Sequence, residues 1–291
     1  MVGSVTLSDG RRFGYDEVGA PAGDPVLFVP GSGASSLNRP PAQEAARRGL
    51  RMVCVDKPGY GESTAKPGYS LKDLTDDITG LVDTLGWDRF AVLGFSIGGW
   101  QALALARQLP GRVTRVVTAA CPAPTIADRR LLAAYHPQSV LWGLLRVLPP
   151  AQRAVVGRWV ATHDVASLTT PSRSNPYSSG PDQQLLRTPE WRLVLEEDAP
   201  RVFGNGPDAL LDDLNSAFRQ PRLDPADVPQ RVTVVHGAHD QVARPVVVEV
   251  LTELLPDATC HVIDDGGHWI HMTHAPLLLD AITGQEPGAS E

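Results

Sequence analysis

Apolar residues along the first 120 positions follow two different spacings in turn. Continuous apolar runs, typical of strands buried on both faces of a sheet, alternate with segments whose apolar positions recur at helical spacing. The runs span residues 26–29, 52–55, 90–93 and 113–119. The helical segments span residues 42–48, 71–85 and 98–109. The turn Ser8-Asp9-Gly10 predicts a hairpin between strands at 5–7 and 12–17. This pattern predicts an α/β fold with a mostly parallel central sheet flanked by helices.

The remainder of the chain divides where this alternation stops and where it resumes. Between residues 122 and 227, helical candidates dominate and no strong strand run occurs. These candidates span residues 129–135, 140–147, 151–161, 183–197 and 209–218. Strands at 231–235 and 259–263 then alternate with helices at 245–255 and 276–282. We therefore expect one α/β core built from residues 1–120 and 228–291, with a helical domain, residues 121–227, inserted after the sixth strand.

A candidate nucleophile lies between the strand at 90–93 and the helix that follows it. Gly94-Phe95-Ser96-Ile97-Gly98 fits the pattern G-x-S-x-G, in which a serine occupies a sharp strand-to-helix turn. Small residues at positions 94, 98 and 99 relieve the crowding in such a turn. The turn exposes the serine hydroxyl beside the first N–H groups of a helix, which favour an anion. A glycine-rich turn with an incidental serine is the alternative interpretation.

A serine hydroxyl needs a base to take its proton, and the base needs an orienting acid. Asp240 follows the strand at 231–235, and His268 follows the strand at 259–263 after two glycines. Both therefore lie in loops at the carboxyl ends of parallel strands, the edge where ligands bind. We predict a triad of Ser96, Asp240 and His268. The alternatives are His236, His239, His271 and His274 as the base, and Asp264 and Asp265 as the acid.

The predicted oxyanion hole combines two backbone N–H groups aimed at one point. The first belongs to Ile97, which directly follows the serine. We expect the second from the loop after the strand at 26–29 and assign it to Ser32, with Gly33 as the alternative. The turn at 56–63 is predicted to shape the pocket floor, with Asp56 accepting hydrogen bonds from backbone amides.

Taken together, these motifs resemble the α/β-hydrolase fold, in particular single-chain esterases, lactonases and proline-iminopeptidase-like hydrolases. The resemblance covers about residues 5–120 and 228–283. It rests on Pro30-Gly31-Ser32-Gly33, Asp56-Lys57-Pro58-Gly59-Tyr60-Gly61-Glu62-Ser63, Gly94-Phe95-Ser96-Ile97-Gly98-Gly99, Gly237-Ala238-His239-Asp240 and Gly267-His268. The resemblance implies Ser96 as nucleophile, His268 as base and Asp240 as orienting acid. It also implies oxyanion donors directly after Gly31 and directly after the nucleophile. Many members have His-Gly where this chain has Pro-Gly, and proline supplies no N–H.

The predicted helical domain falls where such enzymes carry a helical cap over the active site, and it is rich in aromatic side chains. Most of them are expected to form the cap's own core, while a few line an apolar acyl or aryl pocket. Trp100 and Trp269 stand beside the nucleophile and the base in the sequence. The residues predicted to contact substrate are Gly31, Trp100, Trp142, Trp159 and Trp269.

Composition and charge exclude several classes of binding partner. The 291-residue chain has a formal net charge of -7, so it lacks the basic field that nucleic-acid binding requires. Cys54, Cys121 and Cys260 form no metal-binding pattern, and we expect buried, reduced thiols, no metal and no cofactor. The first residues lack a signal-peptide pattern, and no apolar run is long enough to span a membrane. We predict a cytoplasmic monomer or homodimer that acts on a small-molecule substrate.

The leading hypothesis is a serine hydrolase that cleaves a carboxylic ester or lactone of a small, largely apolar substrate through an acyl-enzyme on Ser96. One alternative is a proline-iminopeptidase-like aminopeptidase, with Glu190, Glu196, Glu197 and Asp198 as candidate acids for the substrate amine. Another is a carbon–carbon hydrolase, lyase or cyclase of secondary metabolism that uses the same triad. A signal-binding protein with slow turnover is the alternative outside catalysis, and labelling by a fluorophosphonate without multiple turnover would favour it.

Overall fold

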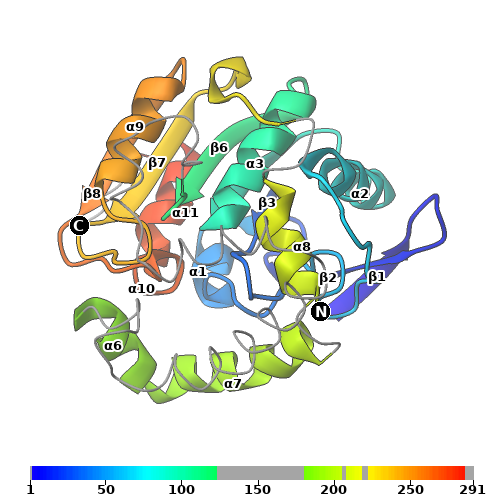
Figure 1. Cartoon of the computed structure of the whole chain (residues 1–291), viewed down its shortest axis with the longest axis horizontal. Helices are drawn as coiled ribbons and strands as arrows, with labels where there is room; N and C mark the ends of the chain where they lie inside the picture. The colour runs from blue at the N-terminus through cyan, green and yellow to red at the C-terminus, as the bar shows by residue number, and fades with distance from the viewer. Residues whose placement is uncertain (1, 123–179, 205–207, 218–221, 286–291) are drawn as a thin grey trace, which may run out of the picture.

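The computed structural model describes residues 2–122, 180–204, 208–217 and 222–285. Its described strands form one sheet of eight, in the order β1-β2-β4-β3-β5-β6-β7-β8. The outer strands β1 and β8 lie on opposite sides of the view in Figure 1. The strands are β1 (Val2–Thr6), β2 (Arg12–Gly19), β3 (Asp24–Val29), β4 (Leu50–Val55), β5 (Phe90–Phe95), β6 (Val113–Ala119), β7 (Val232–Gly237) and β8 (Ala258–Ile263). The β1–β2 hairpin and the β2–β4 pair are antiparallel, whereas the other neighbouring pairs are parallel. The sheet is therefore mostly parallel, as the alternation of strand and helix patterns predicts.

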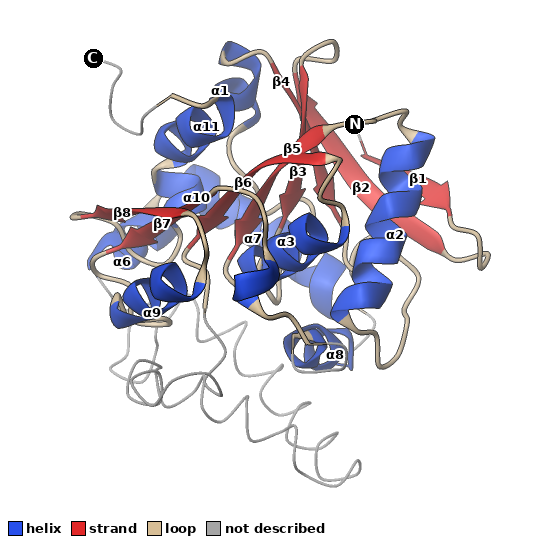
Figure 2. Cartoon of the chain, turned by 90° about the horizontal axis from the view of Figure 1, so that it is seen from above, coloured by secondary structure: helices blue, strands red, loops and turns tan. Residues whose placement is uncertain are grey.

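Helices cover both faces of this sheet (Figure 2). One face carries α1 (Ala42–Arg47) and α11 (Ala275–Thr283), and the other carries α2 (Leu71–Thr84), α3 (Ile97–Gln108) and α9 (Val246–Leu254). Successive strand residues point to opposite faces, so each apolar run contributes to two cores. In β3, Val26 and Phe28 join the core under α1 and α11, whereas Leu27 and Val29 join the core under α2, α3 and α9. This double burial explains why the strands are apolar throughout.

The ends of α2 illustrate how local sequence sets the helix boundaries. Ser70 accepts a hydrogen bond from the Asp73 N–H, and Asp73 accepts one from the Ser70 N–H, which together form a capping box. The chain leaves the helix at Gly86, whose φ of 69° is readily adopted only by a residue without a side chain.

The described part of the insertion between β6 and β7 contains the helices α6 (Gly180–Arg187), α7 (Pro189–Phe203) and α8 (Asp208–Ser216). The predicted single helix at 183–197 is wrong, because the helix is interrupted at Thr188, whose backbone is extended with φ −75° and ψ 120°. A residue before proline is disfavoured in the helical region, and Pro189 then begins α7. The candidates at 129–135, 140–147 and 151–161 lie outside the described residues, and the cap boundaries, 121–227, stay a prediction.

Other parts of the chain differ in detail from the expectation. Cys54 and Cys121 are buried thiols, whereas Cys260 is exposed because β8 lies at the edge of the described sheet. The sequence pattern also missed the one-turn helix α10 (Ile270–Thr273) and the 3₁₀ turn η2 (Pro225–Asp227), which are too short to show a periodicity. Within the four described ranges, we find no helix with the length and apolar character needed to cross a membrane.

Candidate active site

Ser96 occupies the turn between β5 and α3, with φ 52° and ψ −128°. A positive φ is uncommon for a residue with a side chain and stores backbone strain. The surroundings leave no room for larger residues nearby. A Cβ on Gly94 would lie 2.3 Å from the Gly98 carbonyl oxygen, and one on Gly98 would lie 2.2 Å from the Val29 carbonyl oxygen. The motif therefore requires its glycines, because β5, α3 and the end of β3 meet in direct backbone contact.

Asp240 and His268, which follow β7 and β8, form the acid–base part of the site. His268 Nδ1 lies 2.8 Å from Asp240 Oδ2, and both residues are buried. The other carboxylate oxygen, Oδ1, accepts the N–H groups of Val242 and Ala243 at 2.8 and 3.0 Å. The Asp240 carboxylate is thus fixed in orientation and fixes the imidazole in turn. Nε2 lies on the opposite side of the ring, where the histidine of a Ser-His-Asp triad accepts a proton.

The pKa shifts of this pair fit a base and its partner. Burial of the His268 ring lowers its pKa, but the Asp240 charge and hydrogen bond, with a smaller contribution from Asp182, outweigh burial and raise it above 6.5. Burial raises the pKa of the Asp240 carboxyl group, but the His268 ring outweighs that effect and the net pKa lies below 3.8. The ionised carboxylate therefore favours the protonated form of the His268 ring, as the partner of a histidine base would.

Phe95 connects the nucleophile with the base. The centroids of its ring and the His268 ring are 5.1 Å apart, and Ser96 is the next residue in the chain. The hydrogen bond that His268 makes with the described residues of the predicted triad is the one to Asp240. In such triads, the bond from the serine hydroxyl to the ring is often long and tightens only when substrate binds. The fold thus places the three predicted residues at the carboxyl ends of β5, β7 and β8, and joins two of them by a hydrogen bond.

The rival histidines have other partners. His236 Nε2 lies 2.7 Å from the Ala243 carbonyl oxygen and 3.4 Å from Asp240 Oδ2, and burial lowers the pKa of this ring. His271 Nε2 lies 2.7 Å from Asn38 Oδ1, and its ring stacks on Phe95. On the surface, His274 Nε2 lies 3.1 Å from Asp265 Oδ1, which removes that carboxylate as a partner for the base. These contacts favour His268 over each of them.

The candidate oxyanion donors differ in the hydrogen bonds that their N–H groups already make. The Gly33 N–H donates to the Tyr60 hydroxyl at 3.3 Å, so it is already engaged. Among the described residues, the Ser32 and Ile97 N–H groups donate to no acceptor. A Cβ on Gly31 would lie 3.1 Å from both the Phe95 ring and Ser96 Cβ, so this loop packs directly against the nucleophile. This pattern supports Ser32 rather than Gly33 as the second donor.

Asp56 holds the oxyanion loop as the sequence predicts, through backbone amides. Its Oδ1 accepts the Ser36 N–H at 2.8 Å and its Oδ2 accepts the Glu62 N–H at 3.0 Å. A further partner was not predicted, because Arg201 of α7 donates to Asp56 Oδ2 at 3.2 Å. The turn after β4 is thereby tied both to the oxyanion loop and to the cap helices.

Each of the helices α6, α7 and α8 places one buried carboxylate against a loop that carries predicted site residues or the turn after β4, and sequence reasoning missed this role. Asp182 of α6 accepts the N–H groups of His268 and Trp269 at 3.0 and 3.2 Å. Asp198 of α7 accepts the N–H and the hydroxyl of Ser35. Asp213 of α8 binds Lys57 in the turn after β4 at 2.5 Å. A lone aspartate in an amphipathic helix carries no signal that would reveal such a partner.

The predicted substrate contacts fall into different environments. Gly31 lies against the nucleophile, as described above. Trp269 is buried in a cluster with Leu185 of α6 and Met272. Trp100 is 1% exposed within the core under α2, α3 and α9, which favours a packing role over a pocket wall. Trp142 and Trp159 lie outside the described residues.

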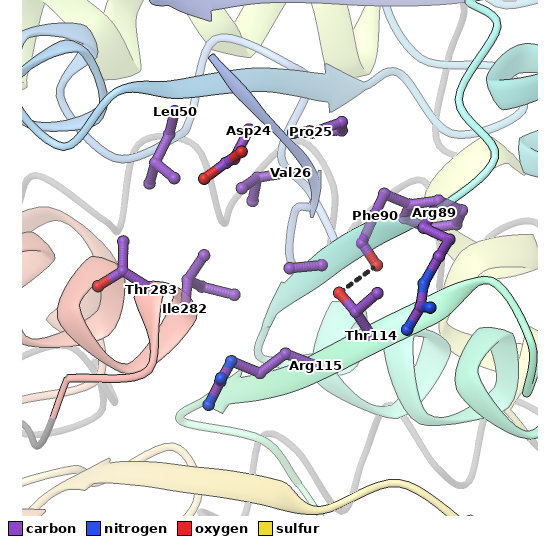
Figure 3. A pocket seen from close by; sticks show the side chains of 11 residues that line it. Asp24, Pro25, Val26, Leu50, Arg89, Phe90, Thr114, Arg115, Ile282 and Thr283 are labelled. Carbon is purple, nitrogen blue, oxygen red and sulfur yellow. Dashed lines mark hydrogen bonds between the residues drawn. The ribbon is translucent and has the colours of Figure 1, made fainter.

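A hollow of about 320 Å³ lies at the opposite edge of the sheet, where β3 and β5 begin (Figure 3). Its lining includes Asp24, Arg89, Arg115 and Thr283. Parallel strands run from this edge to the one that carries Ser96, Asp240 and His268, so the hollow gathers none of the predicted site residues. Ligands of open α/β sheets bind at the carboxyl edge, which makes the triad edge the candidate site.

Comparison with known proteins decides the family. A family model described as the alpha/beta hydrolase fold matches residues 24–275. The chain belongs to the α/β-hydrolase family. A 2-hydroxymuconate semialdehyde hydrolase of Pseudomonas putida is 26% identical over 282 residues, which cover 94% of this chain and 90% of the relative. A pimeloyl-[acyl-carrier protein] methyl ester esterase of Aromatoleum aromaticum is 29% identical over 245 residues, which cover 81% and 89% of the two chains.

Solved structures agree with this assignment at the level of the fold. The enol-lactonase from Burkholderia xenovorans matches with a TM-score of 0.65 and 18% identity, over 97% of this chain and 100% of the lactonase. The family match and the hydrolase relatives together assign the chain as a hydrolase, the broad class that the sequence predicts. Fold and family membership leave the substrate to be argued from the site.

Proposed function

We propose that this α/β-hydrolase is a serine hydrolase that cleaves a carboxylic ester or lactone of a small, largely apolar substrate. The observation that carries the proposal is the 2.8 Å contact between His268 Nδ1 and Asp240 Oδ2, beside a serine held at positive φ. This arrangement suits a proton acceptor next to a constrained nucleophile. The esterase relative, which shares 29% of its aligned residues with this chain, adds support for ester chemistry.

In the proposed mechanism, Ser96 Oγ attacks the substrate carbonyl carbon while His268 Nε2 takes the hydroxyl proton. The negative charge that develops on the carbonyl oxygen is stabilised by the N–H groups of Ser32 and Ile97. The imidazolium then protonates the leaving alkoxide as the acyl-enzyme forms. Water attacks the acyl group with His268 again as base, and the acid is released. Asp240 stays ionised and orients the ring in both halves.

The test is turnover of p-nitrophenyl butyrate by Ser96→Ala, with Ser4→Ala on the exposed strand β1 as the matched control. We expect the Ser96 variant to lose at least about 10³-fold in kcat while its thermal unfolding stays that of a folded protein, and the control to keep full activity. Undiminished turnover by Ser96→Ala would remove the nucleophile assignment and the proposal with it.

A carbon–carbon hydrolase using the same residues is the second candidate, and the similarity to a 2-hydroxymuconate semialdehyde hydrolase over 94% of the chain favours it. The two are separated by comparing kcat/KM for 2-hydroxymuconate semialdehyde with that for a panel of esters and lactones. A larger value for the semialdehyde would replace the ester proposal while keeping the same serine and histidine.

The aminopeptidase alternative finds little support in the described cap helices. Asp198 is buried and bound to Ser35, and Glu196 pairs with Arg192 at 3.0 Å on the exposed side of α7. Glu190 and Glu197 are exposed. The acids expected to bind a substrate amine are therefore dispersed or already bound.

A further inference from the structure

A fully buried ion pair lies beneath the oxyanion loop. Lys57 Nζ is 2.5 Å from Asp213 Oδ2, and both side chains are 0% exposed. Burying two charges carries a large desolvation cost, which a pair recovers only when its remaining hydrogen-bonding groups are also satisfied. A buried ion pair adds little net stability, so we ask which functional groups Lys57 and Asp213 contact.

The carboxylate of Asp213 is saturated with donors from the core. Its Oδ1 accepts the Tyr69 hydroxyl at 2.9 Å and Gln101 Nε2 at 2.8 Å. Its Oδ2 accepts the Tyr60 hydroxyl at 3.3 Å in addition to Lys57. The pair is therefore held in one geometry by residues of α3 and of the loop between β4 and α2.

The ammonium group of Lys57 has a second acceptor in the oxyanion loop. Its Nζ donates to the Gly31 carbonyl oxygen at 2.9 Å. A peptide unit is planar and trans, so the N–H of Ser32 points in the direction opposite to the Gly31 carbonyl. Fixing the carbonyl toward the buried pair therefore fixes the Ser32 N–H on the other side of the same plane. Gly31 packs against the nucleophile, and the Ser32 N–H has no acceptor among the described residues.

The next peptide is held from the same network, because the Tyr60 hydroxyl that contacts Asp213 also accepts the Gly33 N–H. The two peptide units that flank Ser32 Cα, Gly31–Ser32 and Ser32–Gly33, are thus both anchored to the cluster around Asp213. The charge of the lysine also polarises the Gly31–Ser32 amide, which makes its N–H a stronger donor to an anion.

We propose that Lys57 is the positioning residue of the oxyanion hole: paired with Asp213 of α8, it holds the Gly31 carbonyl so that the Ser32 N–H faces the carbonyl oxygen of the substrate. The inference rests on the proposed serine mechanism. Lys57 does not touch substrate, and it acts only through the orientation and polarity of one peptide unit. A preoriented donor matters most when charge develops on the oxygen, so its loss reduces kcat rather than substrate binding.

The test compares variants that leave no lone charge in the core. In Lys57→Met/Asp213→Asn both charges are removed together, and in Lys57→Gln/Asp213→Asn a neutral donor remains at position 57. Lys66→Met, which removes a lysine paired with Asp73 on the surface, is the matched control. For each variant we would measure thermal unfolding, kcat and KM for p-nitrophenyl butyrate, and the inhibition constant of phenylboronic acid, which forms a tetrahedral adduct with a reactive serine.

We expect the methionine double variant to lose about 10- to 100-fold in kcat, with KM changed by less than about threefold and boronate affinity reduced in parallel with kcat. The glutamine double variant should recover part of that loss, and the Lys66 control should match the unaltered protein. A folded methionine double variant with kcat within about threefold of the unaltered protein, or with its loss confined to KM, overturns the proposal. Should the double variants fail to fold, Lys57→Arg, which keeps a cation beside Asp213 but changes the position of the donor to the Gly31 carbonyl, is judged by the same kcat and KM criteria.

Failure of the proposed function is recognised separately in the same assay. Turnover that survives Ser96→Ala removes the serine mechanism and, with it, the need for an oxyanion donor at Ser32. Turnover that requires Ser96 but is indifferent to Lys57 leaves the serine mechanism in place and removes only the positioning role.

Discussion

The loop that carries His268 and the loop that carries Ser32 are both held by carboxylates from the helices between β6 and β7, but in opposite ways. The histidine loop presents N–H groups, so Asp182 accepts them directly. The loop that carries Ser32 presents the Gly31 carbonyl oxygen, which a carboxylate cannot bind, so Asp213 reaches it through Lys57. Farther along the same loop, the Ser35 N–H is accepted directly by Asp198. The difference follows from which backbone atom each loop turns toward the cap helices.

The two arrangements also meet opposite electrostatic needs. In the proposed mechanism, a negative charge behind His268 favours the imidazolium that forms when Ser96 loses its proton, and Asp182 contributes to the raised pKa of this ring. A bare carboxylate behind the oxyanion hole would oppose the negative charge that develops on the substrate oxygen. At that loop the charge of Asp213 is paired with that of Lys57. A buried carboxylate can thus lie behind the Gly31 carbonyl, close to the proposed oxyanion, because Lys57 neutralises its charge.

The largest effect should come from the carboxylate that binds the imidazole ring itself. Asp240→Asn keeps the shape of the side chain but removes the charge and favours the wrong ring tautomer of His268. We expect kcat to fall by about 10³- to 10⁴-fold. Steady-state kinetics above pH 7 would measure this, and a loss smaller than tenfold would mean that another acid, rather than Asp240, serves the base.

Asp182→Asn should have a smaller effect with a distinct pH signature. Turnover requires neutral His268, so kcat/KM falls as the pH drops through its raised pKa. Without the Asp182 charge that pKa falls, and the acid limb of the kcat/KM profile should move to lower pH, with kcat at pH 8 reduced by about tenfold or less. Glu196→Gln, an exposed acid on α7, is the control and should leave the profile unchanged. An acid limb in Asp182→Asn that coincides with that of the unaltered protein would reduce Asp182 to a structural contact.

Asp198→Asn should change turnover least, because Asp198 binds the loop at Ser35 rather than at the proposed donor Ser32. Its main effect should be on the pH dependence of stability. Burial raises the pKa of the Asp198 carboxyl group to about 6, although Ser35 opposes the shift. A carboxyl pKa that is higher in the folded state adds stability at low pH, and this contribution is lost as the pH rises from about 4 through 6. Relative to Asp198→Asn, the free energy of unfolding of the unaltered protein should fall by on the order of 2 kcal/mol between pH 4 and pH 7. Urea titrations of both proteins at the two pH values would measure it, and parallel pH dependences would contradict the assignment.

The placement of the proposed site residues at one edge of the sheet could be predicted because their signals are local. Ser96, Asp240 and His268 each directly follow a strand, and the rule that parallel strands end at one edge brings them together without knowledge of any long-range contact. Ser32 could be placed in its loop by the same rule, but the choice over Gly33 needed the Tyr60 contact.

The carboxylate anchors could not be predicted, because each contact joins positions far apart in the chain. Asp182 meets His268 across 86 positions, Asp213 meets Lys57 across 156, and Asp198 meets Ser35 across 163. No periodicity or motif in an amphipathic helix distinguishes an aspartate that enters the core from one that stays in water. Trp100 illustrates the converse error, since its position beside the nucleophile in the sequence suggested a pocket wall, whereas its side chain packs in the core.

Gly267 gives the contact between cap and core a practical consequence. A Cβ at this position would lie 2.2 Å from Asp182 Oδ1, so even alanine would displace α6 or the loop that it binds. Asp182 and Gly267 are therefore complementary in shape. A chimera that carries the helices of another family member on this core needs an acid at position 182, and it needs glycine at position 267. Without that match, replacing the helices between β6 and β7 to change substrate preference would displace the His268 loop and its imidazole.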